Sequence, residues 1–141
     1  MNIAIIENNK LYRESLRTVL NQIEDFIVVY DSDNSEGITQ LLETGKIDII
    51  LIDYDIVEGN FSQIKEQILK LFPPIKIIVV SNYSEICYSK NLINKGITDI
   101  ISKNSGKKEF EEIIRHAFKA KQLDFEVKTL INGGKVDRFE Y

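Results

Sequence analysis

Five short apolar runs recur along the chain, and a polar segment follows each of them. The central run, Ile47–Asp53, is continuously apolar from Ile49 to Ile52 and ends on a carboxylate. A continuous run of this length favours a strand that is buried on both faces of a parallel sheet. The other four runs are also mainly apolar: Ile3–Ile6, Phe26–Tyr30, Ile75–Val80, which includes one lysine, and Ile97–Ile101, which includes a threonine and an aspartate. We therefore expect five strands.

Between and after these runs, apolar residues recur three and four positions apart, which is the spacing of an amphipathic helix. Four segments have this spacing: Leu16–Ile23, Ile38–Leu42, Phe61–Leu71 and Phe110–Phe118. A fifth helix is expected from a cap at Ser84 to a stop near Gly96. Strands and helices thus alternate strictly and are joined by short connections. This order predicts an α/β fold with a doubly wound parallel sheet, right-handed crossovers and helices on both faces.

The C-terminal residues depart from this alternation. Two segments, Phe125–Ile131 and Val136–Tyr141, flank the turn-forming sequence Asn132-Gly133-Gly134-Lys135, and this pattern predicts a β-hairpin-like tail. We expect one domain over residues 1–121 and a C-terminal extension over residues 122–141. The extension either pairs with a sheet edge or serves as a linker to a further domain.

Composition narrows the partners and the compartment. Eighteen Lys and Arg against twenty-two Asp and Glu give a formal charge of -4, which argues against direct binding of nucleic acid or of an anionic membrane. Cys87 is the only cysteine, so an internal disulfide is excluded. The N-terminal run Ile3–Ile6 is too short for a signal-peptide core or a membrane span. We therefore expect a cytoplasmic protein.

Polar residues at the strand ends predict a functional site. Glu7 and Asn8 follow the first strand, Asp53 ends the third, and Ser81 and Lys103 follow the fourth and fifth. Parallel strands bring their carboxyl ends to one edge, with the first and third strands adjacent at the switch point. Carboxylate and amide oxygens suit Mg²⁺, and a hydroxyl and an ammonium suit a phosphoryl group. Asp53 is then the candidate nucleophile, forming an acyl phosphate.

With these residues in order, the chain resembles the receiver domains of two-component response regulators. The likeness covers about residues 1–120 and rests on an acidic-type pair, a central Asp, a Ser 28 positions later and a Lys 22 positions after that. The segment Ile5–Leu16 is similar to receivers joined to LuxR-type helix-turn-helix domains. The resemblance implies a flavodoxin-like (βα)5 fold of the CheY type with strand order 2-1-3-4-5.

The resemblance also implies a function and partners. A sensor histidine kinase would donate a phosphoryl group to Asp53, with Mg²⁺ held by Glu7, Asn8, Asp53 and the backbone carbonyl of Asp55. Ser81 and Lys103 would contact the phosphoryl group and change the conformation of the face made by the fourth helix, fifth strand and fifth helix. A homodimer would form through this face. A DNA-binding effector domain would lie outside this chain. Such a protein is a signalling domain that catalyses only its own phosphorylation.

Several positions depart from the family pattern. The acidic pair is usually two aspartates, and Asn8 removes one charge about 4 Å from the metal, worth up to ~4 kcal/mol at an effective dielectric constant of ~20. We expect weak Mg²⁺ binding, with Glu7 recovering part of it. The other departures are Ile100 at the usual switch aromatic, Asn104 and Val57 at usual prolines, and Asn82 at a usually small residue. We expect slower phosphorylation than in a typical receiver.

Other interpretations remain open at this stage. Asn8 can cap the first helix instead of binding metal. The whole domain can be a pseudo-receiver, an interaction module that works without phosphate. A nucleotide- or flavin-binding protein of the same architecture is disfavoured, because the turn Glu7-Asn8-Asn9-Lys10 has no glycine to let backbone amides cradle a phosphate. His116 and Cys87 are assigned to packing or surface positions without chemistry.

Overall fold

A five-stranded parallel sheet forms the centre of the molecule. The computed structural model describes residues 1–34, 36–37, 42–43, 46–57, 66, 75–82, 97 and 99–131. The strands lie in the order β2-β1-β3-β4-β5, and every neighbouring pair is parallel. Their bounds are β1 Asn2–Ile6, β2 Ile27–Ser32, β3 Ile49–Asp53, β4 Lys76–Ser81 and β5 Asp99–Ser102. The expected fold class and strand order are confirmed.

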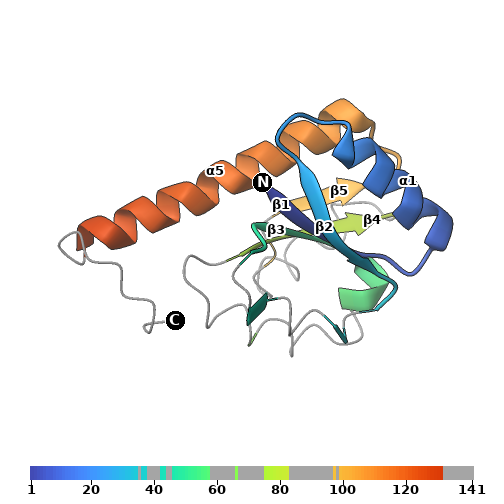
Figure 1. Cartoon of the computed structure of the whole chain (residues 1–141), viewed down its shortest axis with the longest axis horizontal. Helices are drawn as coiled ribbons and strands as arrows, with labels where there is room; N and C mark the ends of the chain where they lie inside the picture. The colour runs from blue at the N-terminus through green and yellow to red at the C-terminus, as the bar shows by residue number, and fades with distance from the viewer. Residues whose placement is uncertain are drawn as a thin grey trace.

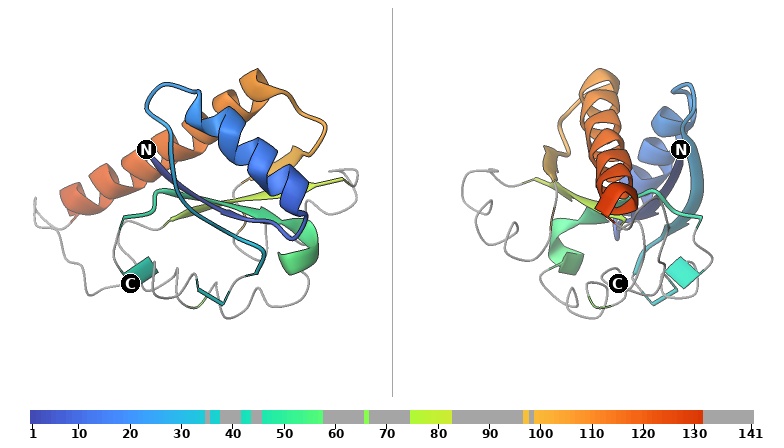
Figure 2. Two further views of the ribbon diagram at one scale, coloured as in Figure 1. Left: turned by 45° about the vertical axis from the view of Figure 1, so that its right-hand side comes forward. Right: turned by 90° about the vertical axis from the view of Figure 1, so that its left-hand side faces the viewer.

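Two helices, α1 (Lys10–Asn21) and α5 (Lys107–Ile131), cover one face of the sheet side by side (Figures 1 and 2). Leu16 and Leu20 of α1 and Phe110, Ile114 and Ala117 of α5 are buried in one cluster with strand residues. Alternate strand residues point to the opposite face, where a second cluster includes residues of the helical turn 54–57 that follows β3. The three central strands β1, β3 and β4 are therefore buried on both faces, which explains their apolar runs, whereas the edge strand β2 leaves Ile27 and Val29 exposed.

Strand register sets the position of the polar strand ends. Ile6 of β1 pairs with Ile52 of β3, and Ser81 of β4 pairs with Ser102 of β5. Residues 7, 53, 81 and 103 therefore come to the same edge of the sheet. Among the described residues, no helix is long and apolar enough to cross a membrane.

The predicted C-terminal hairpin is wrong over its first strand. Residues Phe125–Ile131 belong to α5, which runs without interruption from Lys107 to Ile131. This stretch contains neither glycine nor proline, so a helix nucleated on the sheet can extend outward one hydrogen bond at a time. The predicted second strand, Val136–Tyr141, lies outside the described residues. So does most of the three helices expected between β2 and β5.

Candidate functional site

Lys103 joins two acidic side chains at the carboxyl edge of the sheet. Its Nζ lies 2.5 Å from Oε1 of Glu7 and 3.0 Å from Oδ1 of Asp53. Glu7 and Asp53 are both buried, and the Lys103 side chain is 12% exposed. Two carboxylates, one just after β1 and one at the end of β3, thus share one ammonium from the residue that follows β5. The cluster carries one net negative charge when all three groups are ionised.

Three hydrogen bonds hold Glu7 in the loop after β1. The Glu7 amide donates to the carbonyl of Ser32 at 2.9 Å, and its Oε2 accepts the amide of Asn9 at 3.0 Å. Nη1 of Arg13 donates to the Glu7 carbonyl at 2.7 Å, while Nε of the same residue lies 3.4 Å from Oδ1 of Asp31. These contacts tie the loop to α1 and to the end of β2, so Glu7 has a fixed direction toward Lys103.

Asn9, and not Asn8, is the N-cap of α1. Oδ1 of Asn9 accepts the backbone amide of Tyr12 at 2.9 Å, and the Asn9 backbone is extended, as N-cap residues are. Asn8 is exposed on the loop between Glu7 and this cap. The alternative that Asn8 caps the helix is therefore wrong, and a ligand role for Asn8 stays a prediction.

Burial and mutual charge shift the proton affinities in this cluster. Burial raises the pKa of the Asp53 carboxyl, the hydrogen bond from Lys103 opposes that rise, and the charge of Glu7 adds to it. Desolvation alone would lower the pKa of the Lys103 ammonium, but contacts with Glu7 and Asp53 outweigh it and the pKa is raised. Lys103 therefore stays protonated while Asp53 is a carboxylate of higher basicity than a solvated one.

Tyr12 is a member of the site that sequence reasoning missed. Nζ of Lys103 lies 5.1 Å from the centroid of the Tyr12 ring, within the range of a cation–π contact. Burial, followed by the charges of Glu7 and Asp53, raises the pKa of Tyr12 to about 12. The signal available in the sequence was its place in the first turn of α1, directly after the strand-end loop. A single aromatic residue at that place also fits an ordinary core position.

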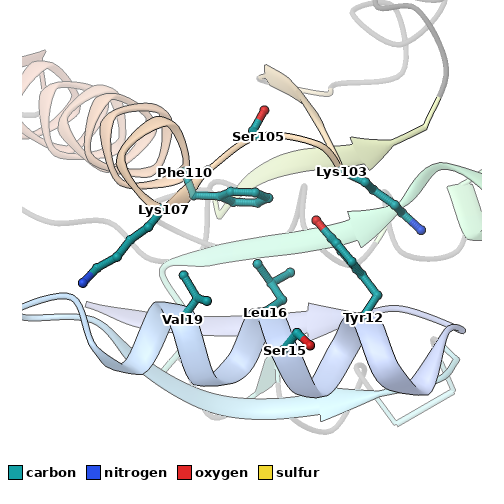
Figure 3. A pocket seen from close by; sticks show the side chains of 9 residues that line it. Tyr12, Ser15, Leu16, Val19, Lys103, Ser105, Lys107 and Phe110 are labelled. Atoms are coloured by element: carbon teal, nitrogen blue, oxygen red, sulfur yellow. The ribbon is translucent and has the colours of Figure 1, made fainter.

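A cavity of about 210 Å³ opens beside this ring. Figure 3 shows Tyr12, Leu16 and Val19 of α1 on one side and Phe110 at the start of α5 on the other, with Lys103 at one end. The cavity is separate from the carboxylates, because neither Glu7 nor Asp53 lines it.

Ser81 lies at the end of β4 and Asp55 just after β3, on the same edge of the sheet as Asp53. Ser81 is buried at the end of β4, and its carbonyl accepts the amide of Lys103 at 2.9 Å. Asp55 is exposed in the helical turn after β3, and its charge contributes to the raised pKa of Asp53. Ile100 is half-buried and packs against the cluster that contains Tyr54. An aliphatic side chain thus fills the position of the usual switch aromatic.

The residues at this edge fit a hard divalent cation. Oε1 of Glu7 is buried and accepts no hydrogen bond of standard geometry among the described residues, so its contact with Lys103 is ionic. This oxygen and Oδ1 of Asp53 converge on one cationic position, as carboxylate ligands of Mg²⁺ do. Within the described part of the chain, no group of three Asp, Glu, His or Cys side chains could hold a metal. Amide, carbonyl and water oxygens would have to complete the coordination.

A sequence model of the response regulator receiver domain matches residues 3–115. The chain belongs to this family. The match includes β1 through the first turns of α5 and hence every residue of the edge cluster. The resemblance that the ordered strand-end residues indicated is therefore confirmed, and the protein contains a receiver domain, which is a signalling domain.

Two curated relatives of this receiver are named as transcriptional regulatory proteins. The transcriptional regulatory protein DegU of Brevibacillus brevis is 26% identical over 101 residues, which cover 72% of this chain and 43% of that protein. The transcriptional regulatory protein LytR of Staphylococcus aureus strain N315 is 28% identical over 124 residues, which cover 88% of this chain and 50% of LytR. This chain thus spans about half the length of the curated relatives it matches.

Solved receivers share the fold. The signal receiver domain of NarL from Mycobacterium tuberculosis superposes with a TM-score of 0.72 at 17% identity, covering 84% of this chain and 95% of that one. A LuxR-family DNA-binding response regulator from Staphylococcus aureus gives a TM-score of 0.70 at 19% identity, covering 83% and 98%. At these identities the likeness concerns the fold, and it agrees with the strand order described above.

Proposed function

We propose that this receiver accepts a phosphoryl group on Asp53 from a sensor histidine kinase. The observation that carries the proposal is the contact of Lys103 Nζ with both Asp53 and Glu7 at the carboxyl edge of the sheet. A carboxylate oxygen of Asp53 attacks phosphorus, the P–N bond of the phosphohistidine breaks, and the imidazole leaves with the electron pair. The product is an acyl phosphate on Asp53.

The other edge residues have separate roles in this proposal. Glu7, Asn8, Asp53 and the backbone carbonyl of Asp55 would hold Mg²⁺, which when bound offsets the negative charge of the phosphoryl oxygens. Lys103 transfers its ion pair from the Asp53 carboxylate to the phosphoryl group. The Ser81 hydroxyl, at the end of the neighbouring strand β4, donates a hydrogen bond to a phosphoryl oxygen.

The output of the switch is a change in protein contacts rather than turnover of a substrate. Phosphorylation draws Ser81 and Lys103 toward the phosphoryl group. Lys103 directly follows β5, and its amide donates a hydrogen bond to the carbonyl of Ser81 at the end of β4, so the movement of either residue is passed to β5. Because Ile100 carries no ring, the change spreads through packing around Tyr54. The effector is a DNA-binding domain outside this chain, a proposal supported by the names of DegU and LytR as transcriptional regulatory proteins and of the Staphylococcus aureus neighbour as a DNA-binding response regulator.

Mass spectrometry of the intact chain tests this function. Incubation with a small acyl-phosphate donor and Mg²⁺ should add the mass of one phosphoryl group, and Asp53→Asn should abolish the gain. Asp55→Asn is the matched control, because it removes a neighbouring charge and keeps the backbone carbonyl, so it should still accept phosphate. A wild-type chain that gains no mass at saturating donor would contradict the proposal.

A phosphate-independent pseudo-receiver is the second candidate function. It is favoured by the ion pairs of Lys103, which already engage both buried carboxylates, and by the uncharged Asn8 that follows Glu7. In that case neither Mg²⁺ nor a phosphoryl mimic alters the NMR spectrum of the edge residues. Chemical-shift changes around Asp53 and Lys103 on addition of both would exclude it.

A further inference from the structure

The two halves of α5 carry their apolar residues on different faces. In the first half, Phe110, Ile114 and Ala117 are buried against the sheet. One turn further along the same face stands Lys121, whose Nζ lies 2.7 Å from Oδ1 of Asp48 before β3. The sheet-facing stripe therefore ends in an ion pair between α5 and the residue before β3.

A second apolar stripe begins where the first one ends. Leu123, Val127, Leu130 and Ile131 are exposed, with Leu130 79% and Ile131 72% accessible. At 3.6 residues per turn this stripe lies roughly 120° around the helix from the sheet-facing one. It is therefore no continuation of the contact with the sheet. Four large apolar side chains on one exposed face indicate a binding surface.

The spacing of this stripe identifies the shape of its partner. Leu123, Val127 and Leu130 of this stripe, preceded by the half-buried Ala120, lie at intervals of three, four and three residues, which is the a and d spacing of a coiled coil. A β-branched residue at a with leucine at d favours two parallel strands. The projecting part of α5 stands clear of the sheet, so a second helix can lie along it (Figures 1 and 2).

We propose that the C-terminal half of α5 pairs with the same segment of a second copy of this chain in a parallel, in-register coiled coil. Ala120 and Val127 take the a positions, and Leu123 and Leu130 take the d positions. All four seam positions are apolar in this register, so the paired helices bring no charge into their interface.

This surface differs from the face of the fourth helix, β5 and α5 that the family resemblance implies, and it requires no phosphate. The stripe covers about two heptads, so the dimer is weak and depends on protein concentration. Two receivers joined at these helices would point their C-termini in the same direction. Any segment that follows α5 would thus emerge as a pair.

Sedimentation equilibrium of the full chain over a wide concentration range tests the pairing. The wild-type chain should shift from monomer to dimer, and Val127→Lys should raise the dimer dissociation constant at least about tenfold, because it puts a charge into the helix interface. Gln122→Lys adds the same charge at an exposed position off the stripe and should leave the constant unchanged. Far-UV circular dichroism should show equal helix content in both variants.

Disulfide trapping tests the orientation. In a Cys87→Ser background, Leu123→Cys should form a disulfide-linked dimer on mild oxidation, because d positions of a parallel pair face each other. Gln122→Cys in the same background should stay monomeric. A monomeric wild-type chain, a dimer insensitive to Val127→Lys, or equal trapping of both cysteine variants would overturn the proposal. Dimerisation only after removal of residues 132–141 would also overturn it, because those residues would then cover the stripe.

Discussion

Lys103 Nζ lies 3.0 Å from Oδ1 of Asp53, although 50 residues separate them in the chain. The parallel sheet brings them together, because β3 and β5 both end at the same edge with β4 between them. The same ammonium contacts Glu7 after β1. The ammonium of Lys103 stabilises two carboxylates whose burial is otherwise unfavourable. It also links the proposed phosphoacceptor Asp53 to β5, the strand that Lys103 follows.

Lys103→Met should destabilise the fold. It leaves Glu7 and Asp53 as buried like charges without a cation, so the free energy of unfolding in metal-free buffer should fall by roughly 2–4 kcal/mol. Urea denaturation measures this difference. Lys108→Met removes an exposed lysine at the start of α5 and should change the free energy by no more than ~0.5 kcal/mol. An unchanged Lys103→Met variant would show that the cluster is hydrated and not ion-paired.

Asp53→Asn should stabilise the fold at neutral pH. Because the pKa of Asp53 is raised on folding, the favourable contribution of its protonated form is present below the ordinary value of 3.8 and is lost as pH rises through the folded pKa. The free energy of unfolding of Asp53→Asn should therefore exceed that of wild type at pH 7, and the difference should narrow toward pH 4. A wild type more stable than the variant at neutral pH would contradict the direction of this shift.

Asn8→Asp should strengthen Mg²⁺ binding. It restores a carboxylate beside Glu7, and a full charge at about 4 Å is worth enough to raise the affinity at least about tenfold. Isothermal titration calorimetry measures the dissociation constant. Asn9→Asp is the matched control, since it adds the same charge one residue away at the α1 cap, where Asp is also a good N-cap. Equal effects of the two variants would argue against a ligand role for position 8.

Asp48→Ala should weaken the attachment of α5. The Asp48 carboxylate accepts the amide of Asn2 at 2.8 Å and the ammonium of Lys121 at 2.7 Å, so it links β1 and α5 at the amino edge of the sheet. Its loss should cost about 1–2 kcal/mol of unfolding free energy, measured by urea denaturation. Lys121→Met removes only the second contact and should cost less. The opposite ranking would mean that the bond to Asn2 contributes nothing.

The sheet and its polar edge could be predicted from the sequence because both depend on local patterns. Continuous apolar runs such as Ile49–Ile52 mark doubly buried strands, and a parallel sheet then fixes where Asp53, Ser81 and Lys103 meet. Contacts that depend on side-chain direction could not be predicted in this way. Neither the shared pairing of Lys103 with Glu7 nor the ring of Tyr12 beside it follows from spacing alone.

In the C-terminal segment, a local pattern predicted the wrong secondary structure. The alternation of apolar and polar residues from Phe125 to Val127, followed by two glycines, predicted a hairpin strand, yet both residues lie in α5. Helix propagation from the packed first half of α5 outweighs that local β propensity. The exposed stripe through Val127 and Leu130 belongs to the helical period of three and four residues, which the hairpin interpretation concealed.

Borohydride trapping of the phosphorylated chain tests the central claim most directly. Borohydride reduces an acyl phosphate to an alcohol, so phosphorylation at Asp53 should convert that residue alone to homoserine, as peptide mass spectrometry can locate. The conversion should require Mg²⁺ and the phosphoryl donor and should be strongly reduced in Lys103→Met. Homoserine at another aspartate, or none anywhere after treatment with saturating donor, would contradict the account.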